Sequence, residues 1–437
     1  MNQLSIRFLV VGALVLGMLI PLLFVGGVAN ERQRYYTQAV GAIAGSWGAD
    51  QTIIGPLLVL PVLERYLGKS DEGEVVQHFR RHHRVVVPET LAVIVSLDHQ
   101  FRHRAIYEVP VYHANMTVTG RFADLDDTSL VGRYDEVVWD DAILVLGVQS
   151  THAIKEASSL RWSTATLPFK AGTGQTWLGS GVHVELPDVL ETTAVDFEFE
   201  LQLKGTNSFG MAPVGRKSSM SISSTWPHPS FQGQFLPDHY TVRDDGFDAD
   251  WTVHELARNL PASWIVGAND PDLPATQAKV VLHNPVSQYH VIERGIKYGV
   301  LFIALTFLTF VCFELTSPIR FHYIQYGVVG LGLTLFYMTL LSLSEHMSFV
   351  LAYGLATGLL TGLISWYVHS MAHSKSLTVS IMVIVLSLYI VLYTLLKLEA
   401  FALLAGTGVL LVGLTALMFV TRDLSEGVID DLPSETT

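Results

Sequence analysis

The stretch Lys297–His346, KYGVLFIALTFLTFVCFELTSPIRFHYIQYGVVGLGLTLFYMTLLSLSEH, decides the architecture of this 437-residue chain. Apolar residues run through 300–313 and again through 327–343. An α-helix needs about 20 such residues to cross the hydrocarbon core of a bilayer. The segment between the two runs is short and carries one arginine. We therefore predict two membrane-spanning helices joined by a basic turn.

The composition indicates a membrane protein with one large water-exposed insert. Half of the residues are hydrophobic, the mean hydropathy is +0.38, and only 15% are charged, against about 25% in soluble domains. Charged residues are scarce in the N-terminal segment and in the last third of the chain. The net charge of −13 disfavours a nucleic-acid partner, because basic patches supply most of that affinity. The only cysteine, Cys312, lies in a predicted span, so the insert has no disulfide framework.

The N-terminal segment 1–29 carries an apolar run that follows Arg7 and is interrupted by Pro21. One interpretation is a cleaved secretory signal, whose apolar region is usually about 7–15 residues long. The run here is longer and its basic flank is weak, so we expect a retained membrane anchor. The following residues, 31–46, could extend that helix.

The region 30–297 has the pattern of a β-rich domain. Residues 195–204, VDFEFELQLK, alternate apolar and polar side chains without interruption, as a half-buried strand does. Pro and Gly turn signals separate this segment from shorter apolar runs. We predict further strands at 84–87, 91–97, 106–112, 116–120, 142–148 and 220–223.

The rest of the chain, 298–421, reads as a bundle of five helices followed by a tail at 422–437. With the anchor this gives an α-helical transmembrane bundle of six spans, with a large β-rich extracytoplasmic domain inserted after the first. Positive residues in short loops favour the cytoplasm, and Arg7, Arg320, Lys375 and Arg422 fall on one side. We therefore expect both termini inside and the β-rich domain in the periplasm. The predicted spans after the insert are 299–316, 324–343, 348–368, 377–396 and 400–420.

Several motifs point to a known family. They include Trp47-Gly48 with Gly55-Pro56, Trp226-Pro227, Arg294–Tyr298 running into Leu301–Phe307, Phe313-Glu314, Gln325-Tyr326 and Leu343–His346. On these motifs the chain resembles the CreD family of bacterial inner-membrane proteins, described as cell-envelope integrity proteins. Ala105 stands where that family often has glycine. The resemblance implies an inner-membrane location and a role in envelope stress or colicin tolerance, and it supplies no catalytic residues.

Four ionisable residues near the ends of the spans are the candidate functional residues: Glu314, Glu345, His346 and Lys397. Such groups are costly at membrane depth and often mark function. Glu314 could instead be an interfacial carboxylate beside Arg320. Glu345 could pair with Lys397 at the same membrane level, or could belong to a solvated turn.

Neither metal binding nor a cofactor is predicted. The segment around His82 and His83 holds six histidines, but adjacent arginines oppose cation capture and no carboxylate has ligand spacing. His369 and His373 are one helical turn apart without a third ligand. Esterase, penicillin-binding, Walker A and dinucleotide motifs do not occur in the sequence.

These observations favour a non-enzymatic integral inner-membrane protein that supports envelope integrity and stress tolerance through its periplasmic domain. Its partners would be the lipid bilayer and envelope components or other membrane proteins. The alternative is a transporter or lipid-handling protein that uses the polar residues at the span ends. The nearly all-apolar span at 377–396 argues against a polar transport path. A hydrolase is the weakest candidate, because no nucleophile–base motif occurs.

Overall fold

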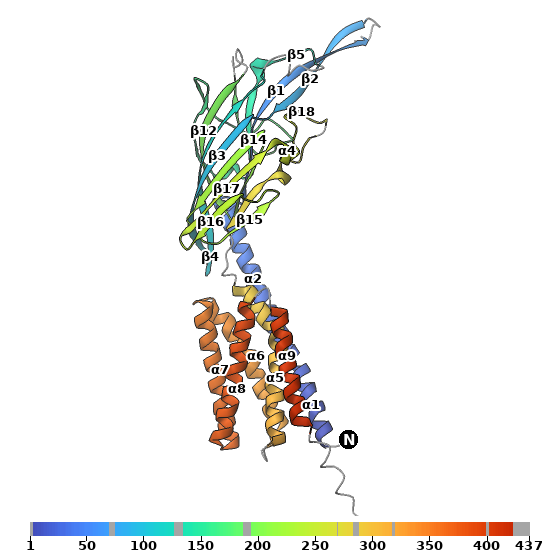
Figure 1. The fold of residues 1–437 in the computed structure, drawn as a ribbon, viewed down its shortest axis with the longest axis vertical. Coiled ribbons are helices and arrows are strands. Elements are labelled where there is room, and N and C mark those ends of the chain that lie inside the picture. Colours follow the sequence, from blue (N-terminus) through green and yellow to red (C-terminus); the bar gives the residue numbers. More distant parts are fainter. Residues whose placement is uncertain are drawn as a thin grey trace, which may run out of the picture. The chain divides into compact units, whose positions relative to one another are not determined.

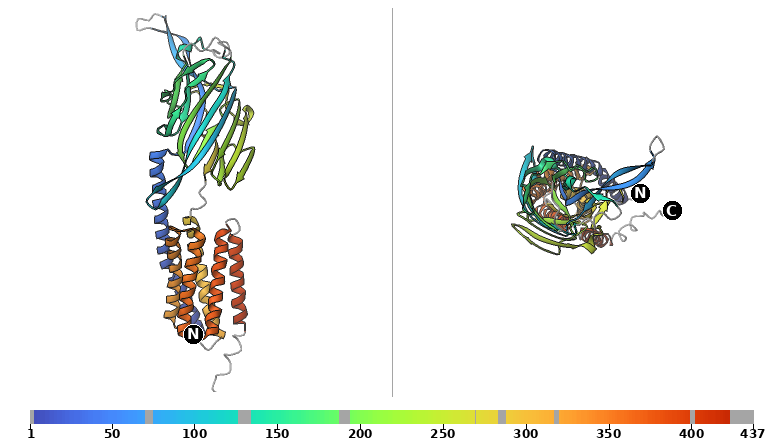
Figure 2. Two further views of the ribbon diagram at one scale, coloured as in Figure 1. Left: turned by 90° about the vertical axis from the view of Figure 1, so that its left-hand side faces the viewer. Right: turned by 90° about the horizontal axis from the view of Figure 1, so that it is seen from above.

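The computed structural model describes residues 3–69, 75–125, 134–186, 194–268, 270–282, 288–316, 320–398 and 402–422. The chain divides into two compact units (Figures 1 and 2). Residues 1–36 and 286–437 form what we call the helical unit, and residues 37–285 form the β-rich unit. The predicted tail thus lies outside the described residues except for Arg422.

Within the described residues, the β-rich unit contains one sheet of ten strands. Strand β1 (Gln51–Lys69) is central, pairing with β2, β5, β6 and, in parallel, β13. The path of the sheet is β10 (Lys170–Ala171), β11 (Gly181–Glu185), β6 (Ile143–Val148), β1, β13 (Ser208–Ala212), β19 (Ala278–Leu282) and β15 (Pro229–Gly233). Attached to it are β2 (Val75–Val86), β5 (Glu136–Val137) and β18 (Ser263–Ile265).

A second sheet has nine strands among the described residues. Its path is β16 (His239–Arg243), β17 (Gly246–His254), β14 (Lys217–Ser224), β3 (Thr90–Arg104), β4 (Tyr107–Phe122), β12 (Val195–Thr206), β8 (Leu160–Trp162) and β9 (Ala165–Leu167). Strand β7 (Ile154–Ala157) also pairs with β12. Short helical turns lie at Trp139–Asp141, Thr151–Ala153, Glu255–Arg258 (α4) and Pro274–Thr276. Apolar side chains of both sheets form one continuous core.

Strand β12 confirms the alternation predicted for residues 195–204. Its apolar side chains, Val195 to Leu203 at every second position, are buried, whereas Asp196 and Glu200 are exposed. Strand β12 pairs with β4 over its whole length. The half-buried pattern therefore reflects a strand with one face on the core.

The short strands predicted at 106–112 and 116–120 are parts of the single strand β4. A two-residue turn joins β3 to β4, since Arg104 pairs with Tyr107. Ala105 in that turn has a φ of 53°, a left-handed conformation that favours glycine. This backbone requirement accounts for a glycine at the equivalent place in the family that the sequence resembles.

The helical unit contains α1 (Gln3–Gly17), most of α2 (Leu19–Trp47), and then α5 to α9. The predicted extension of the anchor is confirmed, because α2 continues to Trp47; its residues from Thr37 onward belong to the β-rich unit. The later helices are α5 (Gln288–Thr316), α6 (Tyr323–Ser344), α7 (Phe349–Ala372), α8 (Lys375–Lys397) and α9 (Ala402–Thr421).

Five helical segments among the described residues are long and apolar enough to cross a membrane. They are Ile6–Trp47, Tyr289–Leu315, Tyr323–Ser344, Phe349–Ala372 and Lys375–Lys397. The sixth predicted span coincides with α9, whose fully described apolar stretch, Leu404–Phe419, is shorter.

A row of glycines on α7 departs from its expected role. The small-xxx-small spacing of Gly354, Gly358 and Gly362 predicts close packing against a neighbouring helix. All three lie on the exposed face of α7, and a Cβ atom at any of them would meet no atom within 4 Å. For contacts within the described chain that prediction is wrong, because the buried face of α7 is formed by other residues, such as Ala356 and Leu360.

Candidate functional site

Glu314 lies in the last turn of α5 and joins two other segments of the helical unit. Its side chain is 8% exposed and pairs with Arg7 of α1, with Nη1 and Oε2 3.4 Å apart. The other carboxylate oxygen accepts the backbone N–H of Phe321, just before α6. The partner is therefore Arg7 rather than Arg320, which is exposed. The ion pair with Arg7 and the hydrogen bond from Phe321 together explain why the Glu314 carboxylate can be largely buried at the end of an apolar helix.

Glu345 is the C-cap of α6 at the opposite end of the bundle. Its carboxylate lies 3.6 Å from Nε of Arg32 in α2. It also accepts a hydrogen bond from the hydroxyl of Tyr289 in α5, at 3.3 Å. The side chain of Glu345 is 10% exposed and that of Arg32 is 44% exposed, so solvent weakens the ion pair. Three helices thus meet at one carboxylate.

The other two candidates, His346 and Lys397, are exposed and belong to no buried site. His346 is exposed, and its Nδ1 lies 3.2 Å from the carbonyl oxygen of Ser342. Lys397 is exposed at the end of α8, with Nζ 5.8 Å from the ring centre of Tyr393. The described partners of Glu345 are Arg32 and Tyr289, and Lys397 is not among them. The structure therefore brings the four predicted residues into no common site.

The partners Arg7, Arg32 and Tyr289 were not predicted. Arg7 and Glu314 are 307 positions apart in the chain, and nothing in local spacing links them. The sequence did offer one indication of these contacts. A carboxylate near the end of a span needs a cation or a hydrogen-bond donor at the same membrane depth, and another helix can supply it.

The β-rich unit contains a polar cleft of about 500 Å³ that the sequence did not reveal. Asp50 and Lys279 form an ion pair in it, with 3.9 Å between the charged atoms. Thr52 donates a hydrogen bond to the side-chain oxygen of Gln277 at 3.2 Å. Gln149 and Ser180 add an amide and a hydroxyl to the walls, while Ile54, Leu178 and Pro274 supply an apolar part. Such a mixture can bind a ligand that has both polar groups and a hydrocarbon surface.

The last turn of α2 is fixed within the β-rich unit by Trp47. The guanidinium carbon of Arg102 lies 4.2 Å from the centre of its ring, and Nζ of Lys204 lies 4.8 Å from it. The ring of His113 meets the indole edge-on at 5.2 Å. Burial, with Lys155, Lys204 and Arg102 nearby, lowers the pKa of His113. Burial first, and the nearby cations second, therefore favour the neutral form of this imidazole.

The six clustered histidines are spread along strands β2, β3 and β4. His82 contacts Glu64 at 2.8 Å, and His99 contacts the hydroxyl of Thr225 at 2.6 Å. Among the described residues, no three His, Cys, Asp or Glu side chains lie close enough together to hold a metal ion.

Comparison with known proteins places the chain in a family. The family described as "Inner membrane protein CreD" matches residues 3–425. The inner membrane protein CreD of Escherichia coli (strain K12) is 34% identical over 416 residues, which cover 94% of this chain and 91% of that protein. Among solved structures, an M1 zinc metallopeptidase from Deinococcus radiodurans matches 44% of this chain and 41% of its own, with 9% identity and a TM-score of 0.21. The length and identity of the first two matches show that this chain belongs to the CreD family of inner-membrane proteins.

Proposed function

We propose that this protein supports cell-envelope integrity by binding an envelope component in the cleft of its β-rich unit, without catalysing a reaction. The observation that carries the proposal is the composition of the cleft. Its described walls hold one ion pair, amides and hydroxyls beside apolar side chains. These groups can orient a ligand through hydrogen bonds and hold its apolar part. Membership of an inner-membrane family makes envelope molecules the accessible partners.

The proposal includes six spans, with both termini in the cytoplasm and the β-rich unit in the periplasm. The support is the distribution of basic residues in short loops, which favours the cytoplasm for Arg7, Arg320, Lys375 and Arg422. Helix α9 is the sixth span in this arrangement. Cysteine labelling of intact cells tests it on a Cys312→Ser background. A cysteine at Ser180 should react with a membrane-impermeant maleimide, and one at Ser434 should not; the reverse pattern would show that the orientation is wrong.

A bulky substitution tests the role of the cleft. Ser180 lies in its wall and is exposed, so Ser180→Trp should obstruct the cleft without disturbing the core. Ser159→Trp is the control, because Ser159 is an exposed serine outside the cleft lining. In cells that depend on this protein under envelope stress, Ser180→Trp should fail to restore survival and Ser159→Trp should restore it, at equal protein levels. Full protection by Ser180→Trp would exclude the cleft as the functional surface.

Glu345 and His346 are proposed to contribute to the same role at the end of the bundle. Glu345 connects α2, α5 and α6 through Arg32 and Tyr289. Its loss would remove the shared partner of those helices.

A further inference from the structure

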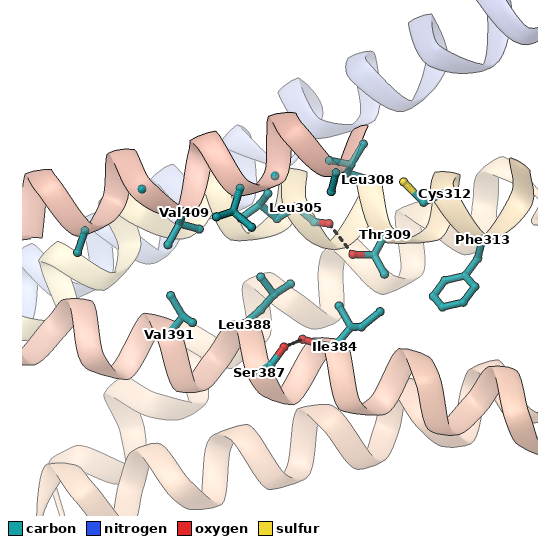
Figure 3. A pocket seen from close by; sticks show the side chains of 15 residues that line it. Leu305, Leu308, Thr309, Cys312, Phe313, Ile384, Ser387, Leu388, Val391 and Val409 are labelled. Carbon is teal, nitrogen blue, oxygen red and sulfur yellow. Dashed lines mark hydrogen bonds between the residues drawn. The ribbon is translucent and has the colours of Figure 1, made fainter. Parts of the chain in front are cut away.

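A groove of about 750 Å³ opens in the helical unit between α5, α8 and α9 (Figure 3). Helix α5 contributes side chains from Leu305 to Phe313, α8 from Ile384 to Val391, and α9 from Ala405 to Ala416. The volume is within the range of about 300–1,000 Å³ that is typical of small-molecule sites. All three walls belong to predicted membrane spans, so the groove lies at the depth of lipid hydrocarbon.

The walls offer almost nothing to a polar ligand. Thr309 donates its hydroxyl hydrogen to the carbonyl oxygen of Leu305 at 2.9 Å, and Ser387 donates to Ile384 at 2.8 Å. Both bonds are drawn in Figure 3 and lie within the residue's own helix. Cys312 is the remaining side chain with a heteroatom in the described lining. An ion or sugar would lose its hydration here without replacement, whereas a hydrocarbon chain would not.

The groove results from the sequence of α9. The α9 wall consists of the small residues Ala405, Gly408, Gly413 and Ala416 together with Val409 and Val412. Leucines of the same helix lie outside the lining and are largely exposed, such as Leu404 at 73%. A Cβ atom at Gly408 would meet nothing within 4 Å, whereas one at Gly413 would lie 2.7 Å from Leu305. Helix α9 thus contacts α5 at Gly413 and leaves an open space beside Gly408.

One end of the groove leads towards basic residues. Each of the three helices has a cation at the end of the bundle where Glu314 lies. Arg320 follows α5, Lys375 begins α8, and Arg422 follows α9; all three are exposed. The carboxylate in the described residues at that end, Glu314, is already paired with Arg7. The described surface at this end therefore favours an anionic headgroup.

We propose that the groove binds an acyl chain of one anionic phospholipid, with the headgroup beside Arg320, Lys375 and Arg422. Apolar burial alone gives no preference for the groove over the surrounding bilayer, because both are hydrocarbon. Selectivity comes from packing against the small residues of α9 and from the headgroup charge. A basic residue near a membrane surface is worth about fivefold in affinity for an anionic lipid. This site is independent of the cleft in the β-rich unit.

The test uses the full-length protein, purified in a mild detergent and analysed by native mass spectrometry after incubation with equimolar phosphatidylglycerol and phosphatidylcholine. Gly408→Leu would place a leucine side chain in the groove and narrow it. Gly358→Leu is the matched control, since it also adds a leucine at an exposed helical glycine with open space but lies on α7. The double variant Arg320→Gln/Lys375→Gln changes exposed charges alone and leaves the groove intact.

The wild type and Gly358→Leu should retain one phosphatidylglycerol per chain, and Gly408→Leu should lose it. The double variant should reduce the preference for phosphatidylglycerol over phosphatidylcholine by up to about twenty-five-fold, from two fivefold steps. Equal lipid retention by wild type and Gly408→Leu would overturn the proposal, as would a double variant with unchanged preference. A lipid-free wild-type dimer that Gly408→Leu converts to a monomer would show that a second copy occupies the groove instead.

Discussion

Two glycines at the end of α2 should respond in opposite directions to the same substitution. Gly48 follows the last residue of the helix with a φ of 141°. A Cβ atom there would lie 2.6 Å from the carbonyl oxygen of Lys204 and 2.7 Å from Cβ of Ala153. Gly45 is helical and exposed, and a Cβ atom there would meet nothing within 4 Å.

The magnitudes follow from these environments. A non-glycine residue in a sparsely populated backbone conformation costs about 1–3 kcal/mol, and the contact with a fixed backbone oxygen places Gly48→Ala at the upper end. Gly45→Ala should stabilise by about 0.5–1 kcal/mol, because alanine restricts the unfolded chain and favours the helix. A domain of this size shifts its Tm by about 2–4 °C per kcal/mol. We expect Gly48→Ala to lower the Tm by about 6–12 °C and Gly45→Ala to raise it by about 1–4 °C.

Thermal unfolding of the full chain in nanodiscs, followed by tryptophan fluorescence, measures both changes. Seven of the eight tryptophans lie in residues 37–285, so the signal reports mainly on the β-rich unit. The fluorescence of Trp47 reports on the end of α2, because its ring contacts Arg102 and Lys204. A Tm for Gly48→Ala within 1 °C of wild type, or a lower Tm for Gly45→Ala, would refute the reasoning.

Three further predictions concern the β-rich core, its pH dependence and the Glu345 contact. Phe199→Ala should cost about 3–5 kcal/mol in urea unfolding, because Phe199 is 2% exposed, and Glu200→Ala should stay within about 0.5 kcal/mol. The lowered pKa of His113 means that the unfolded chain binds the proton more tightly, so stability should fall as the pH drops below about 6.5; His113→Asn should reduce the loss of Tm between pH 8 and pH 5. Glu345→Gln and His346→Ala should each impair survival under envelope stress while changing stability by about 1 kcal/mol or less; wild-type survival of both variants would reduce the contact to a structural turn.

Local sequence patterns predicted the helices and strands, because the burial of side chains in each repeats with a period of only a few residues. Strand β12 shows the predicted alternation, and the helices coincide with the apolar runs to within a few residues at most ends. Helix α5 is the exception: it begins eleven residues before the predicted start at 299. Its first turns carry Arg294 and Lys297. Because the start of the span was predicted from its apolar residues, a charged extension of the helix could not be recognised.

Partners that are distant in the chain could not be predicted. Glu314 and Glu345 were identified as residues of interest from their cost at membrane depth, but Arg7 and Arg32 lie hundreds of positions away. The cleft around Asp50 and Lys279 likewise joins residues from remote strands and loops. Sequence spacing reports on neighbours along a helix or strand, whereas these sites depend on which elements meet in space.

The polar contacts at the helix ends explain how the middle of the bundle can be so apolar. In a bilayer, the burial of apolar surface does little to favour the association of helices. The positions of the helices relative to one another must therefore be fixed by close packing and by polar contacts. Arg7 joins α1 to Glu314 of α5, and Arg32 joins α2 to Glu345. Arg294 of α5 donates to the carbonyl oxygen of Leu396 at the end of α8, at 3.2 Å. Because these contacts fix the helix ends, the central faces need not interlock everywhere. A gap such as the one beside Gly408 can then persist for a lipid chain to fill.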